Sequence, residues 1–372
     1  MTDRTHDLHY MSLALRLAEQ GLGKTSPNPM VGAVVVSKGR IVGQAYHHAA
    51  GRPHAEALAL KQAGARAKGG TLYVTLEPCS HLNKRTPPCA PVVIQSGVRR
   101  VVVAMTDPNP QVSGKGIAQL RRAGLSVTVG VARREAEALN RAYVHWMQTG
   151  RPYVTLKAGM TLDGQIATAG GESKWITGVH ARQDAHRVRA TVDAVLVGIG
   201  TVLSDDPSLT ARRPPRLTAL ASIQPLRIVV DSRLRTPSAA RILKQQRRAQ
   251  TMIATTAAAS LARRRVLEAR GIDVLVVPGG RRRVSLKALL ALLGRRGVVS
   301  VLVEGGGELN ASLMTSKLIN RVRLYVAPTL LGGRQSKGVI GGSGMRFLAQ
   351  AWKLRRISVT RLGADILIEG DL

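Results

Sequence analysis

Three short segments decide the fold of the first half of this chain: Pro53-His54-Ala55-Glu56, Thr75-Leu76-Glu77-Pro78-Cys79-Ser80-His81 and Thr86-Pro87-Pro88-Cys89. His54, Cys79 and Cys89 offer one imidazole and two thiolates, which are ligands that Zn²⁺ prefers. Three protein ligands leave the fourth position of a tetrahedral zinc site open for water, as in catalytic sites. Such a site also needs a proton shuttle beside the water. Glu56, two residues after the histidine, is the candidate catalytic residue.

The residues around these ligands favour two helix starts that face the metal. Pro53 is suited to the first turn of a helix, and the good helix formers of residues 56–60 follow it. Pro78 predicts a second helix that begins at Cys79, after a strand over residues 71–76. Two helix N-termini that face one point would favour the thiolate forms of the cysteines.

Each ligand has a simpler explanation when it is taken alone. The histidine can cap a helix, and the cysteines can be buried as small apolar residues. The combination of His-x-Glu and Pro-Cys in this order, with a second cysteine, matches the signature of zinc-dependent deaminases instead. We therefore expect a hydrolytic zinc site in the first half of the chain.

Length and composition indicate a globular protein with two domains. The chain has 372 residues, which is enough for two separate cores, and 44% of them are hydrophobic. No apolar run approaches the roughly 18 residues of a membrane span, and Asp3, Asp7 and Glu19 interrupt the apolar core that a signal peptide needs. Both cysteines are candidate zinc ligands, so none remains for a disulfide, which favours the cytoplasm.

The net charge of +33 raises the question of a nucleic-acid partner. The basic residues are scattered, with denser clusters at Arg247-Arg248, Arg263-Arg264-Arg265 and Arg281-Arg282-Arg283. Only 3% of the residues are aromatic, which poorly supplies a surface for base stacking. We favour an arginine-rich solvated surface over a nucleic-acid partner. The same field would attract a phosphorylated small substrate.

The first 147 residues predict one layered α/β domain. Apolar residues at helical spacing indicate a helix over Met11–Glu19, and Lys38-Gly39 indicates a hairpin turn. Strands are expected over residues 31–36, 41–43, 71–76, 101–105 and 127–129, with a helix around residues 119–123.

Several motifs of this domain occur together in one known family: Pro27-Asn28-Pro29-Met30-Val31-Gly32-Ala33-Val34, His54-Ala55-Glu56, Leu76-Glu77-Pro78-Cys79-Ser80-His81, Thr86-Pro87-Pro88-Cys89 and Asp107-Pro108-Asn109-Pro110. They resemble the bifunctional pyrimidine deaminase–uracil reductases of riboflavin biosynthesis. The resemblance implies a cytidine-deaminase-like α/β/α domain with Zn²⁺ as cofactor. It also implies substrate contacts by Asn28, His47 and Arg85.

The loop between the two cysteines departs from the family pattern. Nine residues separate Cys79 from Cys89, where the family usually has eight, with a glycine before the basic residue. Asn83 tolerates a left-handed backbone and can replace that glycine. Whether Lys84 or Arg85 faces the substrate stays open, and so does the level of deaminase activity that the longer loop allows.

Residues 152–372 alternate apolar strands with helical stretches, which predicts a largely parallel sheet with helices on both faces. The expected strands cover residues 153–157, 194–197, 226–230, 251–254, 274–277 and 299–303. Ligands bind such sheets at the carboxyl ends of the strands. The turn Gly305-Gly306-Gly307 lies at one such end and suits a phosphate, although glycines at a tight turn are common.

This half resembles the reductase half of the same family in several segments: residues 157–164, 172–177, 200–207, Val230-Asp231-Ser232 and Glu304-Gly305-Gly306. The implied fold is similar to dihydrofolate reductase, with NADPH as cofactor. The implied cofactor-binding residues are Trp175, Thr201, Asp205, Ser232, Gly305, Gly306 and Gly307. The implied substrate-binding residues are Ser173, Arg189, Leu209, Arg212 and Glu304, with Lys157 as a catalytic residue near the ribose.

The chemistry of these side chains suggests roles for two pairs, and two other positions have simpler explanations. Arg189 and Arg212 can hold a phosphate bidentately, and Lys157 with Glu304 can protonate the ribose oxygen as the ring opens. By spacing alone, Trp175 can equally be a core residue and residues 205–207 a plain turn.

We thus expect a cytoplasmic, homo-oligomeric enzyme that deaminates a diaminopyrimidinone ribosylamino 5′-phosphate and then reduces its ribosyl group with NADPH. Three alternatives remain at this stage. They are a nucleic-acid deaminase, a reductase with an inactive deaminase domain, and a non-enzymatic RNA-binding protein with a structural zinc. A nucleic-acid deaminase usually spaces its cysteine pair as Cys-x-x-Cys, and a structural site usually has four protein ligands.

Overall fold

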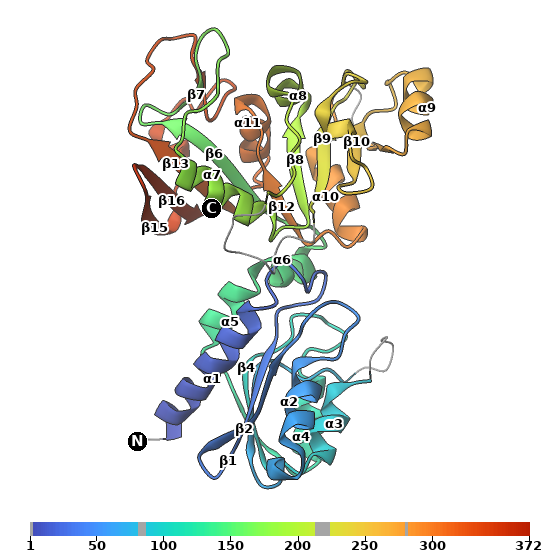
Figure 1. Ribbon diagram of the computed structural model, residues 1–372, viewed down its shortest axis with the longest axis vertical. Coiled ribbons are helices and arrows are strands. Elements are labelled where there is room, and N and C mark those ends of the chain that lie inside the picture. Colours follow the sequence, from blue (N-terminus) through green and yellow to red (C-terminus); the bar gives the residue numbers. More distant parts are fainter. Residues whose placement is uncertain (1–2, 81–86, 213–223, 280–281) are drawn as a thin grey trace. The chain divides into compact units, whose positions relative to one another are not determined.

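The computed structural model describes residues 3–80, 87–212, 224–279 and 282–372 (Figure 1). Over these residues the chain divides into two compact units, Met1–Gly150 and Arg151–Leu372. Each unit has its own hydrophobic core, so each is described by itself.

The first unit is built on one mixed β-sheet. Its described strands run in the order β2-β1-β3-β4-β5. They are β1 (Gly32–Ser37), β2 (Arg40–Tyr46), β3 (Thr71–Leu76), β4 (Arg100–Met105) and β5 (Ser126–Val129). β1 is antiparallel to β2 and β3, whereas β3, β4 and β5 are parallel. The strands and the hairpin expected from the sequence are confirmed.

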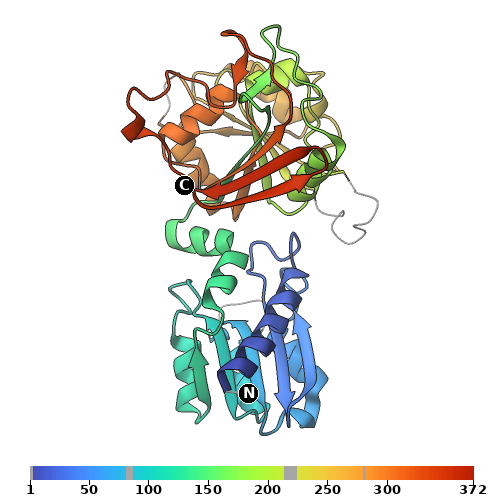
Figure 2. The same ribbon diagram turned by 90° about the vertical axis from the view of Figure 1, so that its left-hand side faces the viewer.

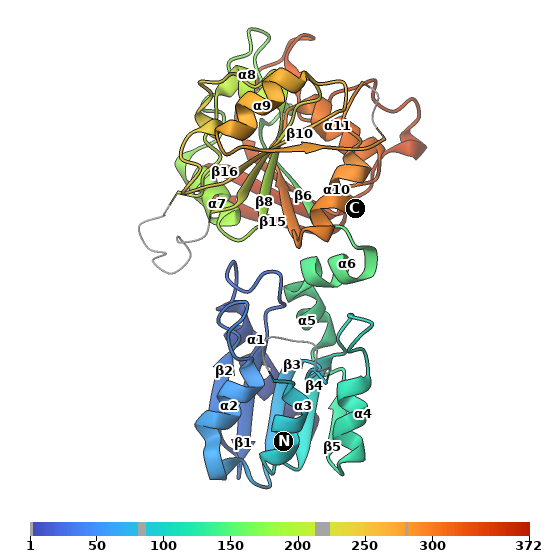
Figure 3. The same cartoon turned by 90° about the vertical axis from the view of Figure 1, so that its right-hand side faces the viewer.

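Helices cover both faces of this sheet (Figure 3). On one face lie α2 (Ala55–Ala63), α3 (Cys89–Gln95) and α4 (Lys115–Arg122), and on the other lie α1 (Asp3–Glu19) and α5 (Arg133–Leu139). A further helix, α6 (Arg141–Thr149), ends the unit. The three layers are those of the expected α/β/α fold.

Two glycines let α1 and α2 lie directly against the sheet. A Cβ atom on Gly32 in β1 would lie 1.9 Å from the backbone oxygen of Ala14 in α1. A Cβ atom on Gly43 in β2 would lie 2.1 Å from the backbone oxygen of Ala59 in α2. Glycine is therefore required at both positions, and α2 holds the zinc-ligand segment at a fixed depth.

The expected helix start at Cys79 is wrong. The second helix of the site is α3, which begins at Cys89 after the N-cap residue Pro88. Residues 77–80 carry no helix and instead lie beside the start of α3, where the backbone N–H of Ala90 donates to the carbonyl oxygen of Cys79 at 3.0 Å. Helix α1 also begins earlier than expected, at Asp3.

The second unit contains a large sheet whose strands, among the described residues, run in the order β11-β10-β9-β8-β12-β6-β13-β16-β15. They are β6 (Tyr153–Thr161), β8 (Ala194–Gly198), β9 (Leu226–Val230), β10 (Thr251–Thr255), β11 (Asp273–Val276), β12 (Ser300–Val303), β13 (Arg321–Ala327), β15 (Arg355–Leu362) and β16 (Asp365–Asp371). The strands from β11 to β13 are parallel, and the β15–β16 hairpin adds an antiparallel edge next to β13 (Figure 2).

The parallel part of this sheet carries helices on both faces, as expected. The helices are α7 (Val179–Arg189), α8 (Ile199–Asp205), α9 (Leu261–Ala269), α10 (Leu286–Arg295) and α11 (Gly307–Thr315). Leu289 of α10 and Leu313 of α11 belong to one core, whereas Val202 of α8 and Leu267 of α9 belong to another. A separate pair, β7 (Gln165–Ala167) and β14 (Lys337–Gly338), joins two loops.

The strand order brings the predicted reductase residues to one edge of the sheet. β9, β8, β12 and β6 are neighbours, and carboxyl ends of parallel strands meet at the same edge. Ser232 follows β9, Thr201 follows β8 and Glu304 follows β12. Lys157 in β6 lies level with Glu304, since the preceding residues Leu156 and Val303 are register partners.

Candidate active sites

The three predicted zinc ligands lie together in the first unit. Nδ1 of His54 is 3.1 Å from Sγ of Cys89 and 3.6 Å from Sγ of Cys79. All three ligand atoms lie within 4.8 Å of one another, and both cysteines are buried. The backbone N–H of Cys89 donates to Sγ of Cys79 at 3.3 Å, which stabilises a thiolate there. One imidazole and two thiolates at this spacing fit a zinc ion with an open fourth position.

Glu56 lies in the first turn of α2, two residues after the ligand His54. Glu56 is only 3% exposed, and its Oε2 atom makes no hydrogen bond to any residue that the structure describes. Burial raises the pKa of Glu56, against the opposing effect of the His54 charge. A buried carboxyl group with an unpaired oxygen beside the metal ligands is suited to exchange protons with a water molecule.

Asn28 and His47 form a hydrogen-bonded chain that ends at the zinc ligand segment. Nδ1 of His47 lies 3.2 Å from the carbonyl oxygen of Pro53, which can only accept, so Nδ1 carries the proton. Nε2 of His47 is then the acceptor, and the amide nitrogen of Asn28 donates to it at 3.1 Å. The rings of His47 and His54 meet edge to face at 5.4 Å. Because the amide nitrogen of Asn28 faces His47, the side-chain carbonyl oxygen of Asn28 is the atom that can accept a hydrogen bond from a ligand.

Glu77 is a buried residue of this site for which no role was expected from the sequence. One of its carboxylate oxygens accepts from the backbone N–H groups of Asp107 and Gly114, and the other accepts from that of Ile117. Gly116 beside it leaves no room for a side chain, because a Cβ atom there would lie 1.9 Å from the carbonyl oxygen of Pro78. Glu77 thus fixes the loop after β4 against the segment that carries Cys79. In the sequence, the only sign of this role was an acidic residue next to Leu76, Pro78 and Cys79.

Arg85, the third residue expected to contact the pyrimidine substrate, lies outside the described residues, as does Lys84. Of the predicted residues in the first unit, the structure brings together His54, Glu56, Cys79, Cys89, His47 and Asn28.

A second cluster of charged groups lies at the carboxyl edge of the large sheet. Nζ of Lys157 is 3.5 Å from Oε2 of Glu304. Arg189 in α7 donates from Nε to Oε1 of Glu304 at 2.5 Å and from its Nη2 to Oε2 at 2.8 Å. Burial would raise the pKa of Glu304, but the charges of Arg189 and Lys157 outweigh it and lower the pKa to about 2. Glu304 is therefore a carboxylate at neutral pH and not a proton donor.

Arg189, which was expected to hold a phosphate together with Arg212, contacts groups of the protein itself. Arg189 gives two nitrogens to Glu304, and its Nη1 donates to the carbonyl oxygen of Thr210 at 3.3 Å. Its guanidinium fork is thus occupied by a carboxylate and a carbonyl of the protein. Arg212 is exposed and presents the more accessible guanidinium of the two.

The predicted cofactor residues follow three neighbouring strands. Thr201 and Gly306 lie close together, since a Cβ atom on Gly306 would be 3.8 Å from Oγ1 of Thr201. Gly307 packs tightly against the loop around residues 338–341, where a Cβ atom would meet backbone atoms below 3 Å. The hydroxyl of Ser232 accepts from the backbone N–H of Val284 at 3.1 Å.

Ser173 and Trp175 lie in the loop before α7, and Asp205 is the last residue of α8. The hydroxyl of Ser173 donates to Oδ1 of Asp205 at 3.1 Å, and Nζ of Lys174 donates to its backbone oxygen at 2.9 Å. Residues 205–207 are thus tied to the 173–175 loop. Trp175 is 70% exposed and carries the guanidinium of Arg182 over its ring at 4.6 Å. The alternative of Trp175 as a core residue is therefore wrong.

Two further positions lie among the predicted substrate-binding residues. The side chain of Leu209 is buried in a core cluster, so only its backbone can face a ligand. His186 in α7 accepts from the backbone N–H of Arg212 at 3.3 Å. Burial first, and then the charges of Arg189 and Arg212, lower the pKa of His186 to about 4. His186 and the buried Tyr325, whose ring centroid lies 5.6 Å from Nζ of Lys157, were not expected from the sequence.

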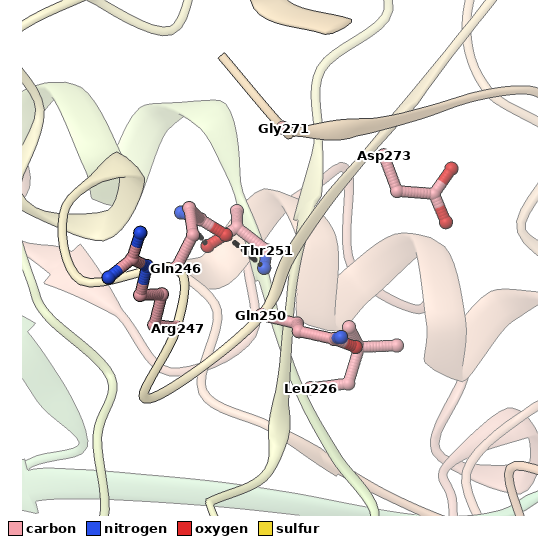
Figure 4. A pocket seen from close by; sticks show the side chains of 7 residues that line it. All are labelled: Leu226, Gln246, Arg247, Gln250, Thr251, Gly271 and Asp273. Carbon is pink, nitrogen blue, oxygen red and sulfur yellow. Dashed lines mark hydrogen bonds between the residues drawn. The ribbon is translucent and has the colours of Figure 1, made fainter.

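A hollow of about 440 Å³ lies elsewhere in the second unit (Figure 4). Its lining residues are Leu226, Gln246, Arg247, Gln250, Thr251, Gly271 and Asp273. Leu226, Thr251 and Asp273 are the first residues of β9, β10 and β11, so the hollow lies at the amino ends of these strands. It is thus at the edge opposite the predicted site and contains none of the predicted residues.

No helix in the described part of the chain is both long enough and apolar enough to cross a membrane.

Comparisons with known proteins match both units. Residues 4–105 match the family model of the cytidine and deoxycytidylate deaminase zinc-binding region, and residues 152–368 match that of the RibD C-terminal domain. The first match is to a zinc-binding deaminase, and the second is to a reductase of the NADPH-using type. Both cofactors expected from the sequence are thereby confirmed.

Full-length relatives share both halves in the same order. The chain is 45% identical to the riboflavin biosynthesis protein RibD of Actinobacillus pleuropneumoniae, over 98% of this chain and 94% of that protein. It is 42% identical to RibD of Escherichia coli, over 97% and 98% of the two chains.

Solved structures agree with these relatives. The RibD structure from Acinetobacter baumannii is 39% identical, with a TM-score of 0.91 and full coverage of both chains. The diaminohydroxyphosphoribosylaminopyrimidine deaminase/5-amino-6-(5-phosphoribosylamino)uracil reductase of Thermotoga maritima is 32% identical, with a TM-score of 0.85 over 100% and 99% of the chains. The chain therefore belongs to the RibD family, the bifunctional deaminase–reductases of riboflavin biosynthesis.

Proposed function

We propose that the His54–Cys79–Cys89 cluster deaminates the pyrimidine and that the Lys157–Glu304 cluster carries out the reduction. The first domain spans residues 1–147 and the second spans residues 152–372. The substrate is a 2,5-diamino-6-ribosylamino-4(3H)-pyrimidinone 5′-phosphate, and the final product is 5-amino-6-ribitylaminouracil 5′-phosphate. The observation that carries the proposal is the presence of one complete cluster in each unit.

In this proposal His54, Cys79 and Cys89 hold the zinc ion. Zinc, when bound, lowers the pKa of a water molecule and makes it nucleophilic near neutrality. Glu56 accepts the proton of that water, because its Oε2 is buried and unpaired among the described residues. The same carboxyl group then delivers that proton to the pyrimidine ring nitrogen as the water oxygen bonds to C2. It next takes the proton of the added hydroxyl group and delivers it to the amino group, which leaves as ammonia while the C2 carbonyl forms. Burial, which raises the pKa of Glu56, favours its protonated form and so its role as a proton donor.

Asn28 and His47 orient the pyrimidine. The His47 imidazole fixes the amide of Asn28 with its nitrogen turned towards Nε2, so the carbonyl oxygen of Asn28 accepts an N–H group of the substrate. A basic residue of the cysteine loop, Arg85 by position, binds the substrate as well.

Trp175, Thr201, Asp205, Ser232 and the turn Gly305-Gly306-Gly307 hold NADPH in this proposal. Bound NADPH supplies the hydride for the ribosyl group. The three turns follow the neighbouring strands β9, β8 and β12. Backbone N–H groups of the glycine turn at the start of α11 bind the cofactor phosphates in this proposal.

Lys157 acts as the acid of the reduction. Its ammonium group donates a proton to the ribose ring oxygen as the ring opens. Glu304 keeps that ammonium in place from 3.5 Å and remains ionised, since its pKa is about 2. Arg189 donates two hydrogen bonds to Glu304 and thereby fixes the orientation of that carboxylate.

The 5′-phosphate is bound by Arg212, by the backbone at Leu209 and by Ser173, whose hydroxyl exchanges its hydrogen bond to Asp205 for one to the phosphate. Arg212 is exposed beside His186, and Arg189 adds positive charge to the same region. A cationic pocket of this kind favours a phosphorylated substrate.

We further propose a homo-oligomer that uses the outer face of the β15–β16 hairpin. Ile357 and Val359 in the edge strand β15 are 60% and 65% exposed, and Ile366 in β16 is 41% exposed. An edge strand with apolar side chains favours pairing with a second copy. Light scattering of the parent chain and of Val359→Lys tests this, because the substitution should shift the mass to that of the monomer. An unchanged mass for Val359→Lys would refute this surface.

A cytoplasmic location is proposed from the two buried free cysteines, which need a reducing compartment to serve as zinc ligands. Fractionation of the producing cells tests it.

The direct test of the two activities uses the zinc-loaded protein and the diaminopyrimidinone substrate. Ammonia release is measured first without NADPH, and NADPH oxidation is measured after its addition. Ammonia release followed by NADPH oxidation is expected. NADPH oxidation with deaminated substrate only, and no ammonia release, would contradict the proposed role of the first unit.

A further inference from the structure

The segment between the two family matches takes part in the first site. Residues 106–151 lie outside both matches, which cover residues 4–105 and 152–368. The segment contains α4, β5, α5 and α6. Asn140, between α5 and α6, is 2% exposed. An amide buried to this degree must find hydrogen-bond partners, and its partners lie far away in the sequence.

Asn140 holds the Met30 backbone through a reciprocal pair of hydrogen bonds. The backbone N–H of Met30 donates to Oδ1 of Asn140 at 2.8 Å, and Nδ2 of Asn140 donates to the carbonyl oxygen of Met30 at 2.9 Å. Both polar ends of the asparagine amide are therefore satisfied by one residue 110 positions earlier in the chain. Two bonds to one residue fix its orientation as well as its position.

Met30 ends the short turn that carries Asn28. Pro27 and Pro29 flank Asn28 and restrict its backbone, so the orientation of the Met30 peptide is transmitted along the turn. The other side of the turn is tied down by the backbone N–H of Asn28, which donates to the carbonyl oxygen of Thr25 at 2.8 Å. Asn28 in turn donates to His47, whose other nitrogen contacts the residue before His54.

We propose that Asn140 is a positioning residue of the deaminase: it sets the turn at residues 27–30 so that the Asn28 amide faces the pyrimidine. The inference rests on the proposed role of Asn28 in substrate binding. It also extends the working deaminase beyond the family match, to the end of α6. Tyr143 of the same helix donates to Oδ1 of Asp107 at 3.0 Å, and that bond provides a matched control in the same segment.

The test compares Asn28→Ala, Asn140→Ala, the double variant and Tyr143→Phe in the full chain. For each, the deaminase KM and kcat, the zinc content and the reductase rate on deaminated substrate are measured. Asn140→Ala should raise the deaminase KM about tenfold, with zinc content and reductase rate unchanged. Adding Asn140→Ala to Asn28→Ala should raise KM by less than about twofold, because the asparagine acts through Asn28. Tyr143→Phe should change KM much less than Asn140→Ala.

Asn140→Asp gives a second readout that a merely structural role would not produce. Its carboxylate still accepts from Met30 N–H but places a charged oxygen against the Met30 carbonyl oxygen. Protonation restores a donor there. Burial and the facing carbonyl oxygen raise the pKa of this carboxyl group. The ratio of the KM of Asn140→Asp to the parent KM should therefore fall as the pH is lowered, whereas that of Asn140→Ala should stay constant.

The outcomes separate the inference from the function on which it rests. If Asn28→Ala leaves the deaminase KM unchanged, the proposed role of Asn28 fails. If Asn28→Ala raises KM but Asn140→Ala does not, the inference alone fails. Three further results would overturn the positioning role. They are KM effects of the two single variants that multiply fully in the double variant, a loss of zinc in Asn140→Ala, and an equal rise of KM in Tyr143→Phe.

Discussion

Glu304 and Arg189 form a bidentate ion pair at the end of β12, and Lys157 lies 3.5 Å from the same carboxylate. One acidic side chain therefore pairs with two cations in a partly buried cluster. This arrangement orients the proposed acid of the reduction and explains why Arg189 is not available as an open phosphate clamp.

Replacement of Glu304 by glutamine should selectively impair the reductase. The Glu304→Gln variant would leave two partly buried cations without their counter-charge, so the free energy of unfolding of the second unit should fall by about 3 kcal/mol. Reduction of deaminated substrate should fall by about 10²-fold. Ammonia release is the internal control and should be unchanged. Reductase activity close to that of the parent would contradict the role of this ion pair.

The ring of Tyr325 should stabilise the ammonium group of Lys157 by a cation–π contact. Nζ of Lys157 lies 5.6 Å from the ring centroid, and the Tyr325 hydroxyl donates to Asp184 at 2.8 Å. Tyr325→Phe keeps the ring and should lower the reductase kcat by less than about fivefold. Tyr325→Leu removes the cation–π contact and should lower kcat by about tenfold or more. Equal kcat values for the two variants would show that the ring face is not involved.

The pH dependence of stability should contain a contribution from His186. Its pKa is lowered from the ordinary 6.5 to about 4, by burial and by the charges of Arg189, Arg212 and Lys157, against the opposing effect of Glu304. Between these values the unfolded chain takes up a proton that the folded chain does not. The contribution of His186 to the free energy of unfolding of the second unit should therefore be fully present above pH 6.5 and should decline as the pH falls towards 4.

Denaturant titrations between about pH 7 and pH 4 measure this contribution. His186→Gln should lose part of the decline with falling pH, because glutamine does not titrate. The control His180→Gln, at an exposed position of the same helix, should keep the parent slope. If His186→Gln also keeps the parent slope, His186 does not titrate as described.

Gly116 should be essential for zinc binding although it is not a ligand. A Cβ atom there would overlap the carbonyl oxygen of Pro78 at 1.9 Å, and Pro78 precedes the ligand Cys79. Gly116→Ala should therefore lower the zinc content and the deaminase rate together, while the reductase rate stays at the parent value. Glu77→Gln, which weakens three hydrogen bonds to the same loop, should produce a milder loss. A full zinc content in Gly116→Ala would contradict this account.

Local sequence patterns predicted the parts of the molecule that depend on neighbouring residues. The zinc ligands and Glu56 occur in short motifs, and the predicted parallel strands of the second unit, β6 and β8 to β12, are mostly apolar runs. The parallel strand β13, which contains Arg321 and Arg323, was not predicted. The triple-glycine turn after β12 was also expected, since a strand and a helix start flank it. These features need no knowledge of distant contacts.

The features that were missed or wrong depend on contacts between distant residues. Pro78 was a reasonable helix start by itself, but the backbone near Cys79 pairs with the start of α3 at Ala90. The strand β15 was not predicted: it lies at the sheet edge, and arginine, serine and threonine make up most of its largely exposed residues. Asn140 and Met30 are 110 residues apart, and no local pattern connects them.

The most direct test of two separate active sites mixes two variants, each of which lacks one half-reaction. Glu56→Gln should not release ammonia but should reduce deaminated substrate, and Lys157→Ala should release ammonia but not oxidise NADPH. With the diaminopyrimidinone substrate and NADPH, neither variant alone should form the ribitylaminouracil phosphate, and their mixture should form it. A mixture that forms no product, or a Glu56→Gln variant that also loses reduction, would contradict the assignment of the two reactions to the two units.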